Sequence, residues 1–210
     1  MTDYTIVGDI VTTMDNIVIP KDVNILVIVY TNLNNLVLPY LSKLTDIIIT
    51  YNRILTGLYL FYNIELVNLC ICHNSLTDVD LSNVTKLIYL NLKNNKLTSI
   101  NLSKNIALVK LFLDNNKLTG INLSKNTALM YLNINWNNLI SLDLCKNTTL
   151  VSLHIRNNKL YNPNFLSPAV NLQHLNIKKN NIKSKSTYLY CSYKLHYLKS
   201  DIVNISDYIM

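Results

Sequence analysis

Three residues with side chains suited to nucleophilic or metal chemistry lie together at Cys70, Cys72 and His73. A zinc site needs four ligands, and no spaced pair of histidines or cysteines follows to complete this one. A cysteine nucleophile needs a histidine base and a third group that orients the base. On an extended strand, Cys70 and Cys72 would face the same way, with His73 near the edge. We therefore interpret Cys70 and Cys72, like Cys145 and Cys191, as free thiols.

A 21-residue repeat determines where these side chains lie. Four segments share one pattern at this spacing: LIYLNLKNNKL (87–97), LVKLFLDNNKL (108–118), LMYLNINWNNL (129–139) and LVSLHIRNNKL (150–160). Related segments that begin at residues 23, 44, 66 and 172 complete eight units of the form L-x-x-L-x-L-x-x-N-x-L. The alternation L-x-L predicts a short strand with one buried face in each unit. Because one such strand cannot bury its apolar face alone, we expect the units to stack about 4.8 Å apart into a parallel sheet.

The pattern resembles that of the leucine-rich repeat family over residues 23–183. The 21-residue length and the LSKN element at 102–105 are similar to short bacterial or viral members. The resemblance implies an α/β-type repeat solenoid. This would be a curved array with a parallel β-sheet on the concave face and short turns, 3₁₀ or extended segments on the convex face. Both ends of a stacked core need cover, so we expect residues 1–22 to form an N-terminal cap or degenerate repeat and residues 184–210 a basic, tyrosine-rich C-terminal cap. Whether residues 4–7 cover the apolar strand face of the first units stays open.

An asparagine column follows the strands, with Thr31 in its place in the first unit. Its members are Asn52, Asn74, Asn95, Asn116, Asn137, Asn158 and Asn180. An inward-facing amide both donates and accepts hydrogen bonds, so it can satisfy backbone groups where each strand turns. Glycine is scarce, with three residues, so we also expect asparagine to take the awkward backbone conformations of the convex connections.

The third, fifth and seventh positions of each unit point away from the core, and the eighth lies at the sheet edge. Asp46 and Asp114 share this outward face, but three repeats separate them by roughly 14 Å, too far for a two-carboxylate glycosidase. His154 and His174 fall on neighbouring strands without two further zinc ligands. No phosphate-binding glycine loop is present. We expect a protein that is not an enzyme and that binds neither a metal nor a cofactor.

The outward face gathers aromatic side chains in its middle and cations toward the C-terminal end. Trp136 takes the eighth position, where the neighbouring units carry Asn115 and Asn157. Since the repeat tolerates many sizes there, we expect Trp136 to contact a partner rather than to fill a hole. Aromatic groups on a rigid surface are common interface anchors, although they can also pack among themselves. The predicted partner-binding residues are Tyr89, Phe112, Tyr131, Trp136, His154, Arg156, His174, Lys178 and Lys179.

The charge distribution leaves three functional hypotheses. The net charge is +7, and the whole excess lies in residues 146–210. We favour a non-catalytic module that binds a protein partner on its concave strand face, and the resemblance raises a role at a host–pathogen contact. The first alternative is binding of nucleic acid or another acidic surface through the basic C-terminal third. The second is a structural or adhesive repeat protein.

The sequence also predicts a compartment. Acidic residues stand in the first ten positions, where a signal peptide needs basic ones. The longest apolar run, ILVIVY at 25–30, is too short to cross a bilayer. We expect a cytoplasmic monomer without membrane contact, in the host cytoplasm if the source is viral. The abundance of Asn, Ile, Lys and Tyr is typical of AT-rich genomes, including those of many DNA viruses.

Overall fold

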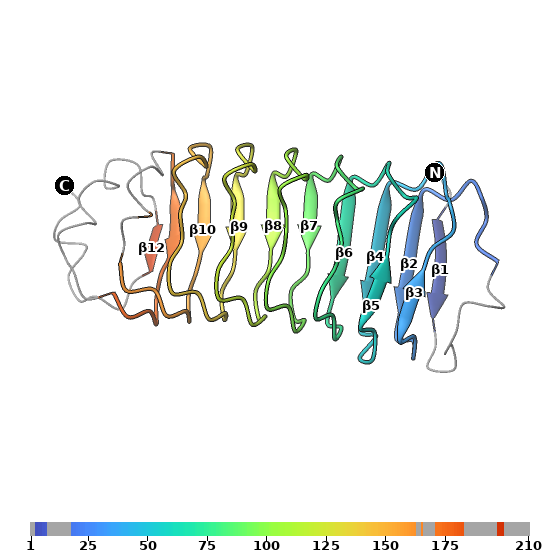
Figure 1. The fold of residues 1–210 in the computed structure, drawn as a ribbon, viewed down its shortest axis with the longest axis horizontal. Helices are drawn as coiled ribbons and strands as arrows, with labels where there is room; N and C mark the ends of the chain where they lie inside the picture. The colour runs from blue at the N-terminus through green and yellow to red at the C-terminus, as the bar shows by residue number, and fades with distance from the viewer. Residues whose placement is uncertain (1–2, 8–17, 163–164, 166–170, 183–196, 200–210) are drawn as a thin grey trace.

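Parallel strands stacked side by side form one long sheet (Figure 1). The computed structural model describes residues 3–7, 18–162, 165, 171–182 and 197–199. Within them the main sheet has ten strands in sequence order. These are β1 (Asp3–Val7), β2 (Ile25–Val29), β4 (Asp46–Thr50), β6 (Asn68–Cys72), β7 (Tyr89–Asn91), β8 (Lys110–Phe112), β9 (Tyr131–Asn133), β10 (Ser152–His154), β11 (His174–Asn176) and β12 (Tyr197–Lys199).

Two further strands lie in the connecting segments of the first units. β3 (Asn35–Val37) and β5 (Gly57–Tyr59) pair in parallel and lie in front of the main sheet in Figure 1. The later connections consist of turns, bends and residues without regular secondary structure instead. Each coil of the solenoid therefore contributes one strand to the main sheet and returns through a connection on the opposite face.

The predicted alternation of buried and outward residues is confirmed. The strand leucines Leu69, Leu90 and Leu111 stand in register on neighbouring strands and are fully buried. Because each coil adds its leucines to the same core, this core is continuous from Ile19 to Ile177. Two outward positions differ from the pattern. Cys72 and Ser152 are buried, at 3% and 7% exposure.

The ends of the sheet extend the repeat by strand pairing. β1 pairs in parallel with β2 from Asp3↔Ile25 to Val7↔Val29. Residues 4–7 thus lie beside the first full unit in the plane of the sheet and do not cover its outward face. β12 pairs in the same way with β11. Most other residues of the two predicted caps lie outside the described part of the chain.

The asparagine column has the structural role that the sequence predicts. Asn116 accepts the backbone N–H of Leu97 at 3.0 Å and donates to the carbonyls of Leu92 and Leu113, both at 3.0 Å. The same bonds recur from coil to coil with Asn74, Asn95, Asn137, Asn158 and Asn180. In the first unit, the N–H of Thr31 donates to Asn52 Oδ1 at 2.7 Å. Each amide therefore joins two coils where the chain leaves the sheet.

A second buried asparagine column, which the sequence analysis missed, runs along the connecting segments. Its members are Asn63, Asn105, Asn126 and Asn147, and fully buried Val84 occupies the equivalent position in another unit. Asn126 Nδ2 donates to the carbonyls of Leu102 at 3.1 Å and Asn105 at 2.9 Å. Its Oδ1 has no hydrogen-bond partner within the described residues. The signal in the sequence is the asparagine of the LSKN element, which recurs every 21 residues.

Left-handed backbone conformations mark the exit of each strand. Among the described non-glycine residues, positive φ angles of 54° to 60° occur at Tyr30, Tyr51, His73, Asn94, Asn115, Trp136, Asn157 and Lys179. The expectation that asparagine takes such conformations in the convex connections is therefore wrong. The sharp turn falls where the chain leaves the sheet, at the eighth position of the unit, and most residues there are not asparagine. We call this row the exit column.

The two asparagine columns differ in what their loss would cost. Asn116→Leu removes the acceptor of a buried N–H, so we expect the free energy of unfolding to fall by about 1–3 kcal/mol. Asn126→Val should cost less than about 1 kcal/mol, because Leu102 and Asn105 carbonyls also accept backbone N–H groups at 3.1 and 3.3 Å. Urea unfolding of both variants measures the difference. Equal losses would contradict this division of roles.

Candidate protein-binding site

The aromatic part of the outward strand face begins with a ring pair. Tyr89 on β7 and Phe112 on β8 have ring centroids 5.6 Å apart at an interplanar angle of 43°. Asn91 Nδ2 donates to the Tyr89 hydroxyl at 3.1 Å, which fixes the ring on the strand face. Both rings are half-buried, and this burial raises the pKa of the Tyr89 hydroxyl above its ordinary value. The pair presents a rigid apolar surface with one polar end.

A lysine separates this pair from the next aromatic residue. Lys110 stands between Tyr89 and Tyr131 in the strand register. Its Nζ lies 5.4 Å from the centroid of the Tyr131 ring, and Tyr131 is 38% exposed. This cation–π contact holds a positive charge within the aromatic patch.

Trp136 lies in the exit column after β9 and projects into solvent. Its side chain is 53% exposed, so it does not fill a hole in the core. The Arg156 guanidinium lies 5.7 Å from the centroid of the indole ring, and the backbone N–H of Trp136 donates to the Arg156 carbonyl at 2.8 Å. At φ 55°, the backbone of Trp136 adopts a conformation that costs a bulky residue free energy and that asparagine tolerates better.

The C-terminal end of the face is basic. His154 Nε2 lies 3.1 Å from Ser152 Oγ on β10, and Ser152 pairs with His174 of β11. Lys178 is half-buried, and Lys179 is exposed at the end of the exit column. Within the described residues, no three His, Cys, Asp or Glu side chains gather closely enough to hold a metal ion.

Aromatic rings stack at the N-terminal end of the exit column, which was not predicted from the sequence. The ring centroids of Tyr30 and Tyr51 are 5.2 Å apart, and those of Tyr51 and His73 are 4.6 Å apart, with nearly parallel planes. Asn94 Nδ2 lies 3.2 Å from the His73 ring nitrogens, and Asn115 bonds to Asn94 in turn. Burial and the nearby Lys93 ammonium lower the pKa of His73, which favours a neutral ring. The signal was the occurrence of aromatic residues at the eighth position in consecutive units.

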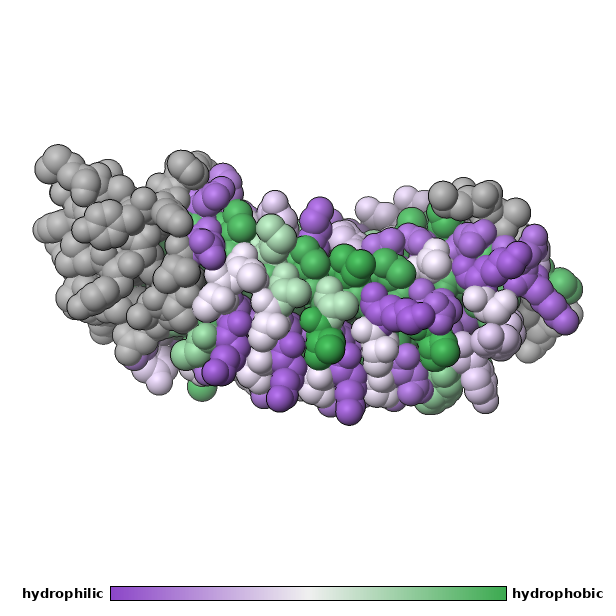
Figure 2. Space-filling model, turned by 90° about the horizontal axis from the view of Figure 1, so that it is seen from above, coloured by the Kyte–Doolittle hydropathy of each residue, from purple (hydrophilic) through white to green (hydrophobic). Residues whose placement is uncertain are grey.

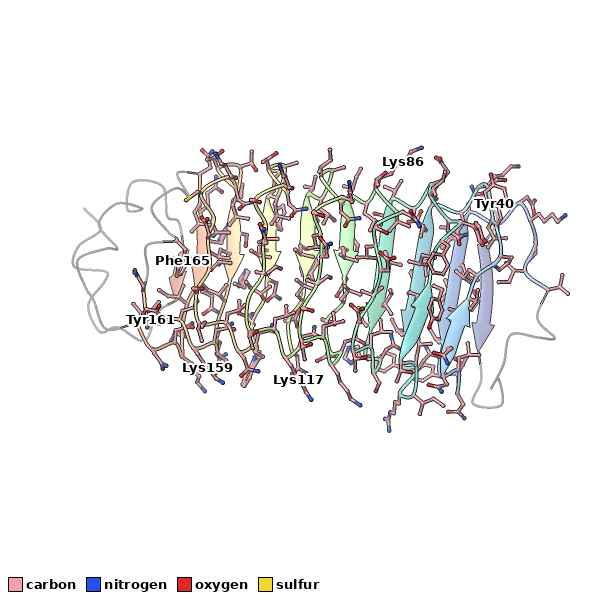
Figure 3. All side chains as sticks on the ribbon, viewed as in Figure 1. Tyr40, Lys86, Lys117, Lys159, Tyr161 and Phe165 are labelled. Atoms are coloured by element: carbon pink, nitrogen blue, oxygen red, sulfur yellow. The ribbon has the colours of Figure 1, made fainter. Side chains whose placement is uncertain are left out.

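Some of the described lysines lie at the edges of the sheet rather than on the strand face. Figure 3 shows Lys117 and Lys159 at the edge where the strands end and Lys86 at the opposite edge. Lys86 forms an ion pair with Glu65 at 2.6 Å. In the described part of the basic C-terminal third, Arg156 lies over Trp136 and Lys159 lies at the edge where the strands end. Residues 183–196, which carry further lysines, lie outside the described part of the chain.

An apolar band along the edge where the strands begin was also missed. Figure 2 looks onto this edge and shows hydrophobic residues along its middle, with hydrophilic residues beside them. Ile88 and Met130 immediately precede β7 and β9 and are 45% and 38% exposed. The sequence pattern that could have predicted this band is an apolar residue at the second position of consecutive units, which is not one of the buried leucine positions of the repeat. This band lies apart from the predicted site on the strand face.

Comparison with known proteins identifies the fold. No protein-family model and no curated protein match the chain. The functional domain of InlJ from Listeria monocytogenes is 24% identical with a TM-score of 0.71, over 85% of this chain and 44% of that one. A leucine-rich repeat protein of Leptospira interrogans is 23% identical with a TM-score of 0.76, over 85% and 49%. The protein has a leucine-rich repeat fold.

Another match agrees with this assignment. The leucine-rich repeat domain of APL1B is 18% identical with a TM-score of 0.69, over 83% of this chain and 56% of that one. The leucine-rich repeat chain thus spans about half the length of the solved structures it matches. The predicted fold, a curved repeat array with a parallel sheet on its concave face, is confirmed. Within the described ranges, no helix is long and apolar enough to span a membrane.

The positive φ of Trp136 leads to a prediction about the stability of a variant at this position. In Trp136→Asn, relief of the backbone strain offsets the loss of the cation–π contact, which is worth about 0.5–1 kcal/mol at an exposed site. We expect the free energy of unfolding to stay within about 1 kcal/mol of the native value. Urea unfolding measures it. A loss above about 2 kcal/mol would mean that the indole packs as part of the fold.

Proposed function

We propose that the strand face from β7 to β11 of this leucine-rich repeat protein binds a protein partner. The observation that carries the proposal is Trp136. A large apolar side chain stands half-exposed in a backbone conformation that disfavours it, while the equivalent positions on either side hold Asn115 and Asn157. The fold gains little from tryptophan at this place, so a contact with another molecule explains its presence better than packing does.

The proposed site combines apolar anchors with positive charge. Tyr89, Phe112, Tyr131 and Trp136 would fill apolar hollows of the partner. Lys110 and Arg156 already lie against two of these rings, so a partner carboxylate could pair with a cation beside each anchor. The basic end is formed by His154, His174, Lys178 and Lys179. A partner with an acidic surface around exposed apolar side chains fits this arrangement.

The cytoplasmic location stays a prediction. The free thiols of Cys70, Cys72 and Cys145 support it, because reducing compartments keep cysteines unpaired. The role at a host–pathogen contact, which the family resemblance raises, belongs to the same proposal. Fractionation of the source cells, or of infected host cells, would test the location.

The binding proposal is tested by parallel capture with three proteins. The native chain, Trp136→Asn and Tyr62→Ala are immobilised and exposed to nuclease-treated extract. Tyr62 is the matched control, because it is an exposed aromatic residue, at 62%, on a connecting segment away from the strand face. We expect one partner to be retained by the native chain and the Tyr62 variant. Its complex with Trp136→Asn should be weaker by about 2 kcal/mol or more, roughly 30-fold in Kd.

Three other outcomes would contradict this proposal or favour one of its alternatives. A partner bound equally by all three proteins would overturn the role of Trp136. In a separate titration of the native chain, tight binding of non-specific RNA with a steep salt dependence would favour the nucleic-acid alternative. Self-association of the native chain without a second protein would favour the structural or adhesive alternative.

A further inference from the structure

A pair of thiols lies on the outward strand face of the third unit. Cys70 and Cys72 of β6 project to the same side, and their Sγ atoms are 3.0 Å apart, close enough for one thiol to donate to the other. Neither forms a disulfide. Cys70 is half-buried and open to small reagents, whereas Cys72 is only 3% exposed. Since β6 pairs with β4 on one side and β7 on the other, the backbone holds the two sulfurs together.

The surroundings shift the pKa values of the two thiols in opposite directions. Donation from the Cys72 thiol lowers the pKa of Cys70, and the nearby Lys93 ammonium lowers it further, against the opposing effect of burial. The same bond and burial raise the pKa of Cys72. Around the pair stand Lys93 and three titratable groups of neighbouring residues, His73, Tyr89 and Asp114. Cys70 is therefore the more acidic thiol of the pair, and Cys72 stays a protonated donor beside it.

We propose that Cys70 and Cys72 form a redox-active dithiol that undergoes thiol–disulfide exchange with a small-molecule disulfide. The Cys70 thiolate attacks one sulfur of the external disulfide, whose S–S bond breaks and releases one thiolate. Cys72 gives its proton to the thiolate released in this first step and, as a thiolate, attacks Cys70 Sγ in the mixed disulfide. The Cys70–Cys72 bond forms, and the second thiolate leaves. The external disulfide gains two electrons, and the protein dithiol loses two.

Another cysteine of the chain provides an internal control. Cys145 is exposed, yet its thiol carries the opposite shift, because the Asp143 carboxylate accepts its hydrogen bond and raises its pKa. Exposure alone would make Cys145 the more reactive thiol. Thiolate character and a neighbouring second sulfur would make Cys70 the more reactive one. The two explanations thus predict opposite orders of reaction.

The test follows each cysteine separately in the full-length reduced protein. The protein is incubated with oxidised glutathione at neutral pH, quenched by alkylation and cleaved with trypsin. Cleavage after Arg53 and Lys86 releases both cysteines of the pair on one peptide, while Cys145 and Cys191 fall on two others. We expect the 54–86 peptide to lose two hydrogens and both alkylation sites at least about tenfold faster than Cys145 gains glutathione.

Two conservative variants separate the steps. Cys72→Ser should stop at the mixed disulfide between Cys70 and glutathione. Cys70→Ser should leave Cys72 reduced, because the buried thiol lacks a reactive neighbour. The proposal is overturned if the native 54–86 peptide keeps glutathione without closing, if it reacts no faster than Cys145, or if it oxidises only by joining another cysteine peptide. The result for the native protein decides the matter even if a variant folds poorly.

Discussion

The structure depends on hydrogen bonding at the point where each coil leaves the sheet. There some backbone groups, such as the Trp136 N–H, bond to a carbonyl of the next coil, whereas others, such as the buried Leu97 N–H, bond to an asparagine side chain. An inward amide such as Asn116 supplies an acceptor for one coil and donors for two carbonyls, so adjacent coils become joined. Because an unpaired buried N–H is costly, this column fixes both the spacing of the coils and the register of the strands.

Stacking of this kind separates the residues that maintain the fold from those that are free to vary. The leucines and the two asparagine columns recur because every coil meets the same neighbours. The third, fifth, seventh and eighth positions face outward, so rings, amides, thiols and cations can stand there with little effect on the core. The Tyr89–Phe112 pair, the Arg156–Trp136 contact and the Cys70–Cys72 pair all use this freedom. In such a repeat protein the outward positions of the sheet can therefore carry binding or reactive groups while the core of the repeat stays the same.

Much of the fold could be predicted because its causes are local and periodic. The L-x-L alternation gives the strands, and the 21-residue spacing gives the parallel stack and the outward face. The second asparagine column could have been predicted from the LSKN element in the same way. The backbone conformation of the exit column could not, because Tyr30, Trp136 and Lys179 give no local signal for positive φ. Side-chain neighbours such as Lys110 over Tyr131 depend on rotamers that the repeat does not specify.

The sequence by itself determined the repeat, its register and the set of side chains that face outward. Periodicity is sufficient for this, because each unit repeats one solution to the burial of its leucines. Only the tertiary structure decided which outward groups meet. Residues 20 to 23 positions apart come within contact distance only after the coils stack. Arg156 then lies over Trp136, His73 closes the ring stack, and Lys93 comes near Cys70. These contacts across coils give the strand face its chemistry.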